Sequence, residues 1–344
     1  MRTVLVCLAL ILTVRLDALP PDAAACAGCH RAQSQAWAGN SMSKALYTPA
    51  ESAILRDNAR LAFTLGRFRY SIEQSTYSVT DGAATLSAPI LYAFGQGFAG
   101  QTYAYRHDGK WYESRVSYYK ETKSLDLTMG APAGEPKTLV EAAGREMTGK
   151  DVVACFGCHT TNSVKRTPEG SQEVDFKNLQ AGIGCENCHT GAAAHAAGFA
   201  AKPPKAAPVA RLARLSTEEQ SDFCGRCHRT WADIAASGPR GLGNVRFQPY
   251  RLANSKCYDS TDARISCTAC HDAHAGLDRN LANYDSKCAA CHGAGRTKSG
   301  ARSCPKAARE CAGCHMPRYE IPGSHHLFTD HQIRIVRPNE TYPN

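Results

Sequence analysis

The chain has 344 residues, a length that fits one large domain or two modest domains. Its 40 lysines and arginines outnumber its 31 aspartates and glutamates, which gives a formal net charge of +9. Because the basic residues are scattered and do not form runs, this charge does not predict a nucleic-acid partner or an anionic membrane surface.

Residues 1–18 are predicted to be a secretory signal peptide. Met1 and Arg2 precede an apolar run over residues 3–14, and small and polar residues follow. A run of this length is too short to cross a bilayer and fits the apolar region of a signal sequence, with cleavage near Ala18; an uncleaved anchor is the alternative. The sequence therefore predicts an exported protein, periplasmic or otherwise extracytoplasmic, with no transmembrane span in the mature chain.

The pentapeptide Cys-x-x-Cys-His occurs seven times in the remaining chain. Its cysteine pairs are Cys26 and Cys29, Cys155 and Cys158, Cys185 and Cys188, Cys224 and Cys227, Cys267 and Cys270, Cys288 and Cys291, and Cys311 and Cys314. The histidines that complete these motifs are His30, His159, His189, His228, His271, His292 and His315.

In this motif the two thiols form thioether bonds to the vinyl groups of a haem, and the adjacent imidazole ligates the iron. Structural zinc sites need paired half-sites and an even count, whereas a redox-active dithiol needs a single motif. Seven copies therefore predict seven covalently attached haem c groups. The propionates of seven haems add about fourteen negative charges, which the irons offset only in part, so the holoprotein is expected to be nearly neutral.

Seven haems in 344 residues leave little protein for each cofactor. We therefore expect a mostly α and irregular array with low secondary-structure content and a haem-filled core. Residues 19–65 form an N-terminal segment with the first motif. Within it, residues 41–61 are rich in Ala, Leu, Lys, Arg and Glu, a composition typical of a helix interrupted near Pro49.

Residues 66–130 have a different composition and contain no motif. Aromatic and β-branched residues alternate with others over residues 68–72, 76–79 and 102–105. Asp108-Gly109 is the signal of a tight hairpin turn, with residues 111–119 as the returning strand. We expect a small antiparallel β-rich insert that packs over a haem or, alternatively, meets a partner.

Residues 131–344 are predicted to form a six-haem array. Prolines among alanines indicate a linker near residues 196–211, and Ser216 to Glu219 form a capping box that begins a helix carrying Cys224 to His228. The motifs are irregularly spaced, which is not typical of a solenoid of equal repeats. Cys257 and Cys304 lie outside the motifs. They are expected either to form a disulfide with each other or to be two buried thiols.

Each iron also needs a sixth ligand or an open face. The candidate distal ligands are His195, His274, His325, His326, His331 and Met42. Two imidazoles on one haem hold their Cα atoms roughly 12 Å apart, while three residues span at most about 10 Å. His274 is therefore expected to reach a haem other than that of His271, and His195 is tethered nearly as closely to His189.

Two further residues are weaker candidates for ligands. His107 flanks the hairpin turn, where a solvated side chain is typical, and Met316 is a weaker alternative to Met42. His325 and His326 are adjacent, so one of them is expected to support a ligand and not to bind iron itself. The chain has fewer candidate distal histidines than the seven predicted haem irons. We therefore expect at least one haem to be five-coordinate.

Several segments resemble the multihaem cytochromes related to the tetrahaem electron acceptor of hydroxylamine oxidoreductase, with a doubled set of motifs. The similar segments are residues 26–43, residues 184–195, residues 267–274 and residues 314–317. The resemblance spans nearly the whole mature chain and implies outward-facing electron transfer. The family commonly has a histidine where Met42 stands, so its bis-histidine ligation does not carry over to that haem.

The leading hypothesis is an electron carrier in which haems pass electrons along the chain to redox partner proteins, either other cytochromes or a membrane quinol-linked donor. An oxidoreductase that acts on a small nitrogen or sulfur compound at one five-coordinate haem is the alternative. The Cys-x-x-Cys-Lys motif of related nitrite reductases does not occur. A haem-bearing scaffold is a third hypothesis, and no residue is assigned a catalytic role.

Overall fold

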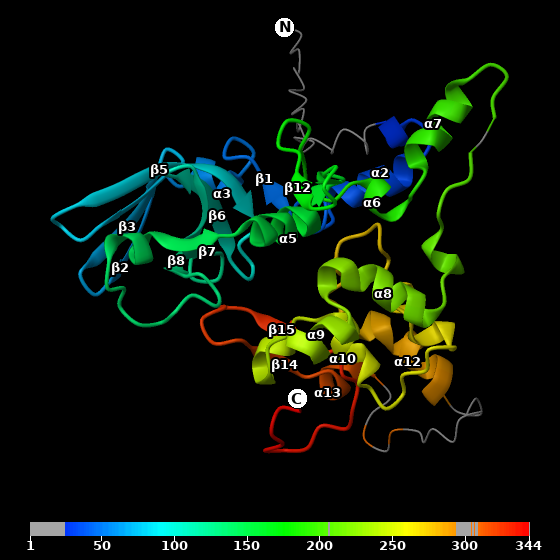
Figure 1. The fold of residues 1–344 in the computed structure, drawn as a ribbon. Coiled ribbons are helices and arrows are strands. Elements are labelled where there is room, and N and C mark those ends of the chain that lie inside the picture. The colour runs from blue at the N-terminus through cyan, green and yellow to red at the C-terminus, as the bar shows by residue number, and fades with distance from the viewer. Residues whose placement is uncertain (1–24, 206, 294–303, 305, 307–308, 344) are drawn as a thin grey trace, which may run out of the picture.

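The computed structural model describes residues 25–205, 207–293, 304, 306 and 309–343. The predicted signal peptide lies outside the described residues. Two regions are evident in Figure 1: a β structure formed by the N-terminal half, and a region of short helices and loops formed by the rest. Among the described residues, no helix combines the length and the apolar character needed to cross a bilayer.

Nine antiparallel strands form the main sheet. Seven of them follow one another in sequence order, β2 (Arg60–Leu65), β3 (Phe68–Glu73), β4 (Thr76–Thr80), β5 (Thr85–Phe94), β6 (Gln101–His107), β7 (Lys110–Tyr119) and β8 (Ser124–Leu127). The short β1 (Leu46–Tyr47) pairs with β5, and β9 (Gly144–Met147) pairs with β7. Because β2 and β8 also contact each other, the seven strands form a nearly closed barrel (Figure 1).

The barrel has a packed interior. Along β3 and β4 every second residue is buried, which places Phe68, Tyr70 and Tyr77 inside. The hydroxyls of Tyr77 and Tyr105 both donate to the carbonyl oxygen of Ala143, at 2.8 Å each. Ala143 belongs to α4 (Leu139–Ala143), which packs against β4, β5 and β7.

The expectation of a mostly α and irregular array with a small β insert is wrong. The sheet begins at Leu46 and ends at Met147, so it is a large barrel and extends beyond residues 66–130 on both sides. The helix expected over residues 41–61 is also wrong, because only α3 (Ala53–Asp57) is helical there and β2 begins at Arg60. Pairing with β3 overrides the helical preference of Leu61 and Ala62.

The predicted hairpin is confirmed. His107 pairs with Lys110 across a two-residue turn, and Asp108 and Gly109 both have positive φ, at 49° and 76°. Both central residues of a type I′ turn have this left-handed backbone, which glycine adopts at no steric cost and aspartate tolerates.

The rest of the chain consists of short elements. The helices are α2 (Arg31–Ala38), α5 (Gly149–His159), α6 (Cys185–Cys188), α7 (Ala192–Ala200), α8 (Thr217–His228), α9 (Trp231–Ser237), α10 (Gln248–Ala253), α11 (Cys267–Cys270), α12 (Asp285–His292) and α13 (Cys311–His315). Single 3-10 turns are η1 (Leu212–Arg214), η2 (Gly241–Asn244), η3 (Ala263–Ile265) and η4 (Leu281–Tyr284). Three two-stranded ladders pair β10 (Thr160–Thr161) with β13 (Gln180–Ala181), β11 (Val164–Arg166) with β12 (Gln172–Val174), and β14 (Arg318–Glu320) with β15 (Leu327–Thr329).

The capping box before α8 is confirmed. The Ser216 hydroxyl accepts a hydrogen bond from the Glu219 backbone, and the Glu219 carboxylate accepts one from the Ser216 backbone. The helix ends at His228 and so carries the whole fourth motif. Helix α7 occupies the first part of residues 196–211, and the next element among the described residues is the 3-10 turn η1.

The helical region has little hydrophobic core of its own. Among the described residues after Gly184, the buried hydrophobic side chains are Ile234, Val245, Tyr250, Leu252 and Ala312. Most of the remaining buried hydrophobic residues belong to the barrel. A region of this size with so few buried apolar side chains needs another source of apolar surface, which haem macrocycles would supply.

Candidate haem-binding sites

Each motif occupies about one turn of helix. In the motifs of His30, His189 and His271, the histidine N–H donates to the carbonyl oxygen of the first cysteine at 2.8, 2.8 and 2.9 Å. The motifs of α5, α8, α12 and α13 lie at the C-terminal ends of their helices. Residues three and four positions apart share a helix face, so this turn places both sulfurs and the imidazole on one side.

Three motif histidines have their Nδ1 atoms held by backbone carbonyls. Nδ1 of His159 lies 2.8 Å from the oxygen of Ala45, Nδ1 of His189 lies 3.0 Å from that of Ala210, and Nδ1 of His315 lies 2.9 Å from that of Arg334. A carbonyl can only accept, so Nδ1 must carry the proton. The lone pair is therefore on Nε2, which leaves this nitrogen able to bind iron.

Two candidate distal ligands show the same arrangement. Nδ1 of His195 donates to the oxygen of Ala207 at 2.9 Å, and Nδ1 of His331 donates to that of Thr329 at 3.0 Å. Burial lowers the pKa of His331 to about 4, so its imidazole is neutral at pH 7 and keeps its lone pair. Both side chains are thus in the tautomer that an iron ligand requires.

Two pairs of imidazoles have the spacing of axial ligands on one iron. The ring centres of His189 and His274 are 6.0 Å apart with the ring planes 5° from parallel, and those of His271 and His331 are 6.2 Å apart. Two metal–nitrogen bonds of about 2 Å each, plus about 1 Å from each nitrogen to its ring centre, also place the rings about 6 Å apart. The ring separation of both pairs is therefore compatible with two histidine ligands on one haem.

His325 has a different environment from the other candidates. Its Nε2 lies 2.7 Å from Oδ2 of Asp126 in β8, and its ring packs edge to face against Tyr119 in β7, at 4.8 Å between ring centres. These contacts join the helical region to the barrel and occupy the nitrogen that usually binds iron. His326 packs against Phe328 instead, so the geometry favours His326 as the ligand of this adjacent pair.

Met42 lies in a small cluster near the first and third motifs. It packs with Trp37 and Ile183, and Cys185 borders the same cluster. The Trp37 indole donates to the carbonyl oxygen of Ile183 at 3.0 Å, and the Ile183 N–H donates to that of Met42 at 3.0 Å. These bonds hold Met42 close to α2 and α6 at once.

The attachment cysteines of different motifs lie side by side. The side chains of Cys158 and Cys227 lie next to each other, as do those of Cys224 and Cys267. Cys288 likewise lies next to Cys311. The sulfur atoms that would carry thioethers therefore connect the second motif to the fourth, the fourth to the fifth, and the sixth to the seventh.

Cys257 and Cys304 are both exposed, which does not agree with two buried thiols. The disulfide between them stays a prediction. Helix α8, which contributes Cys224 and Cys227, contacts both α5 and α11 and lies at the centre of the array (Figure 1).

An aromatic cluster next to His159 was not predicted. Phe94 packs edge to face against the His159 ring at 5.1 Å, and Phe156, within the second motif, packs against Phe94 at 5.2 Å between ring centres. Tyr92, Trp111 and Phe176 surround Phe156. A phenylalanine inside Cys155-Phe156-Gly157-Cys158 was the one local signal, because the partners come from three distant segments.

Residues 110–190 match the model of the family described as "Cytochrome c554 and c-prime". This stretch includes the motifs that end at His159 and His189. A solved structure, "Crystal Structure of Outer Cell Wall Cytochrome OcwA", is 15% identical with a TM-score of 0.35, and the match covers 62% of this chain and 37% of that one. The chain thus spans well under half the length of that protein. No curated protein matches.

Proposed function

We propose that this chain, a multihaem c-type cytochrome related over residues 110–190 to the cytochrome c554 and c-prime family, carries seven haems and passes electrons along them outside the cytoplasm. The observation that supports the proposal is the contact between attachment cysteines of different motifs, such as Cys158 with Cys227 and Cys224 with Cys267. When bound, haem supplies one-electron redox chemistry. The chain fixes the attachment points close together, which is the arrangement that electron transfer between haems requires.

The ring spacings support specific ligand assignments. His274 is assigned to the haem of His189, and His331 to the haem of His271, because these pairs lie 6.0 and 6.2 Å apart. In both cases the distal ligand comes from outside the motif of its haem. Each pair therefore joins two chain segments through one iron and stabilises a region that has few buried apolar residues.

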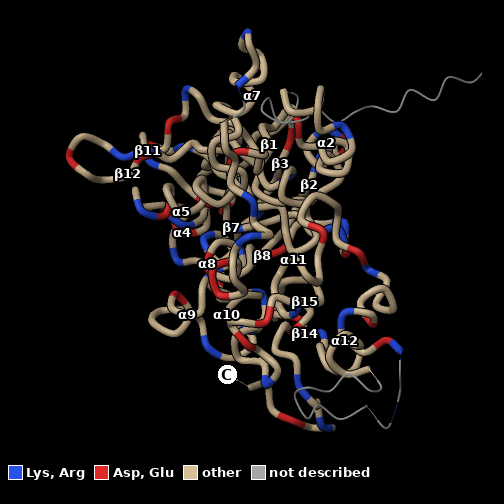
Figure 2. Tube along the Cα trace, turned by 90° about the vertical axis from the view of Figure 1, so that its right-hand side faces the viewer, with Lys and Arg blue, Asp and Glu red and all other residues tan. Residues whose placement is uncertain are grey.

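Redox proteins are the proposed partners, either other cytochromes or a membrane quinol-linked donor. Figure 2 shows Lys and Arg dispersed among Asp and Glu over the described chain, which agrees with the scattered charges of the sequence. This distribution does not favour nucleic acid. A periplasmic or otherwise extracytoplasmic location agrees with the family, since c-type haem is attached outside the bacterial cytoplasm.

The alternative is an enzyme with one five-coordinate haem. It has support in the number of ligands, because His195, His274, His326, His331 and Met42 supply at most five distal groups for seven irons. Catalysis requires an iron with no protein ligand at its sixth position. Water or a side chain of a partner protein can occupy the same position in an electron carrier. We therefore place electron transfer first.

The intact mass of protein from a haem-maturing host tests the proposal. We expect seven covalent haems, and replacement of Cys26 and Cys29 by alanine should remove one haem only. Fewer than six haems in fully matured protein would contradict the seven-haem array. Turnover of nitrite, hydroxylamine or sulfite at rates on the order of 10 per second, together with a change in a high-spin signal alone, would place the enzyme first.

A further inference from the structure

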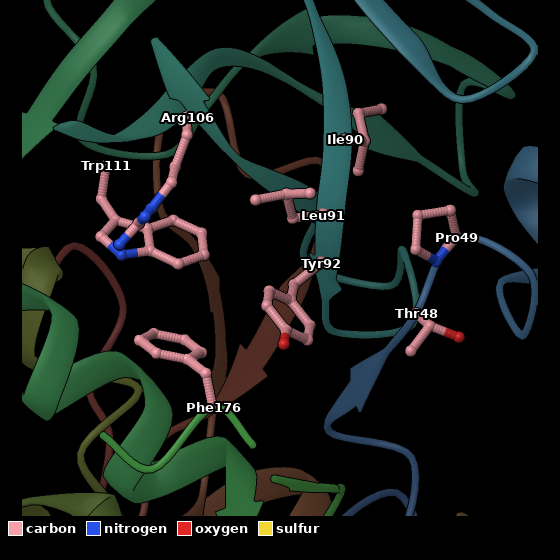
Figure 3. Close-up of a pocket in the computed structure, with 8 residues that line it drawn as sticks. All are labelled: Thr48, Pro49, Ile90, Leu91, Tyr92, Arg106, Trp111 and Phe176. Atoms are coloured by element: carbon pink, nitrogen blue, oxygen red, sulfur yellow. The ribbon is translucent and has the colours of Figure 1, made fainter. Parts of the chain in front are cut away.

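A pocket of about 410 Å³ opens on the outside of the barrel. Its lining residues are Thr48, Pro49, Ile90, Leu91, Tyr92, Arg106, Trp111 and Phe176 (Figure 3). Small-molecule sites typically have volumes of about 300 to 1,000 Å³ and mostly apolar walls. This pocket has such walls, with three aromatic rings and a single charged side chain.

Arg106 supplies the charge. Its guanidinium lies over the Trp111 ring, 4.9 Å from the ring centre, and Figure 3 shows the two side chains together at one side of the pocket. Within the described part of the chain, Arg106 forms no ion pair, and its side chain is exposed. A guanidinium held on an aromatic face and lacking a carboxylate partner is suited to bind an anionic group of a planar ligand.

The walls continue inward to His159. Tyr92, Trp111 and Phe176 each contact Phe156, at 5.0, 5.7 and 5.1 Å between ring centres. Phe156 in turn contacts Phe94, and Phe94 contacts the His159 ring. The pocket is therefore in continuous aromatic contact with the proposed iron ligand of the second haem, and Phe156 lies next to the attachment residue Cys155.

We propose that this pocket binds a planar aromatic anion, a sulfonated or carboxylated quinone, which accepts electrons from the haem held by His159. The ring of the ligand packs on Tyr92, and its acidic group pairs with Arg106, which is held over Trp111 while Phe176 stacks on the same indole. Two ferrous haems each give one electron and become ferric, while the quinone takes two electrons and two protons from solvent to become a hydroquinone. This inference rests on the proposed electron-transfer function and names one acceptor class and its place of entry.

Binding is tested with the oxidised full-length holoprotein and anthraquinone-2,6-disulfonate by titration calorimetry. We expect one saturable site. Arg106→Ala should weaken binding roughly tenfold because a charge-assisted contact is lost, whereas Arg106→Lys should keep part of it. Trp111→Leu should also weaken binding, because it removes the ring that holds the Arg106 guanidinium in place. Arg69→Ala is the matched control, since Arg69 is an exposed arginine of β3 away from the pocket.

Electron transfer is tested by stopped-flow oxidation of the reduced protein. Anthraquinone-2,6-disulfonate is compared with hexaammineruthenium(III), a cation that the positive charge of Arg106 repels from the pocket. We expect Arg106→Ala to slow oxidation by the quinone several-fold and to leave oxidation by the ruthenium complex unchanged.

The outcomes separate the two proposals. If neither acceptor oxidises the wild-type protein, the electron-transfer function itself fails. If the ruthenium complex reacts normally but Arg106→Ala and Trp111→Leu leave quinone binding unchanged, the pocket is not the quinone site. If both variants lose binding while the rate of quinone reduction stays the same, the pocket has no role in electron transfer.

Discussion

The Arg251 guanidinium and the Asp330 carboxylate form a fully buried bidentate ion pair, with Nε to Oδ1 at 2.8 Å and Nη2 to Oδ2 at 2.9 Å. Arg251 lies in α10, and Asp330 immediately precedes His331. The same guanidinium donates to Gln332 at 2.6 Å. This pair therefore fixes the segment that carries the proposed distal ligand of the His271 haem.

Loss of this pair should be costly. Arg251→Met removes the bidentate partner of the buried Asp330 carboxylate and leaves it only the ion pair with Arg334 at 2.7 Å, so we expect the free energy of unfolding to fall by about 3 kcal/mol. Because His331 is adjacent, part of the low-spin signal should also become high-spin. Denaturant titration and electron paramagnetic resonance measure the two effects. Arg60→Ala is the control, since its ion pair with Glu73 is exposed and should contribute less than about 1 kcal/mol.

The ligand assignments make separate predictions for three histidines. His274→Ala and His331→Ala should each convert one low-spin haem to a high-spin haem, because each removes one of a pair of axial imidazoles. His325→Ala should leave the spin states unchanged, since its Nε2 is bonded to Asp126. Electron paramagnetic resonance of the oxidised proteins measures this. A new high-spin signal in His325→Ala, with none in His274→Ala, would reverse the assignment.

Met42 is tested by substitution with leucine, which keeps its packing against Trp37 and Ile183. A thioether ligand produces a sulfur-to-iron charge-transfer band and a raised potential. We expect Met42→Leu to remove the band and lower the potential of one haem. Met316→Leu is the matched control and should change neither. An identical spectrum in Met42→Leu would assign this side chain to packing alone.

The barrel should fold without haem, while the helical region should not. Barrel residues such as Phe68, Tyr103 and Val116 form a buried cluster of their own, whereas few apolar side chains are buried after Gly184. In a chain with all fourteen motif cysteines changed to alanine, hydrogen exchange should show protection over residues 46–147 only. Protection across α8 and α10 in that variant would show that the array has sufficient protein core.

The local features were predictable from the sequence. The seven motifs, the Asp108-Gly109 turn and the capping box at Ser216 each depend on residues a few positions apart, so their signals survive in a short window. The barrel was not predictable in this way. It closes because β2 contacts β8, about sixty residues later in the sequence, and residues 41–61, which include the start of β2, have the composition of a helix.

For the haem-binding sites, too, the local motifs were predictable from the sequence and the tertiary contacts were not. Cys-x-x-Cys-His identifies the proximal histidines directly, but nothing in the sequence indicates which carbonyl holds each Nδ1. Ala45, Ala207 and Ala210 supply their backbone oxygens, which are common to all residues and leave no side-chain signal. The proximity of His189 to His274 likewise depends on tertiary structure. The short separation of His271 and His274 in the sequence had excluded only that these two histidines bind the same iron.

The hydrogen bonds of the proximal histidines have a thermodynamic consequence. An Nδ1–H that donates to a strong acceptor makes its imidazole more basic, which stabilises the ferric iron and lowers the reduction potential. His159, His189 and His315 donate to carbonyl oxygens at 2.8 to 3.0 Å, whereas His228 donates to the amide oxygen of Gln248 at 3.2 Å. The haem of α8 should therefore be easier to reduce than the haems of α5 and α6, and it would accept electrons from both of these neighbours.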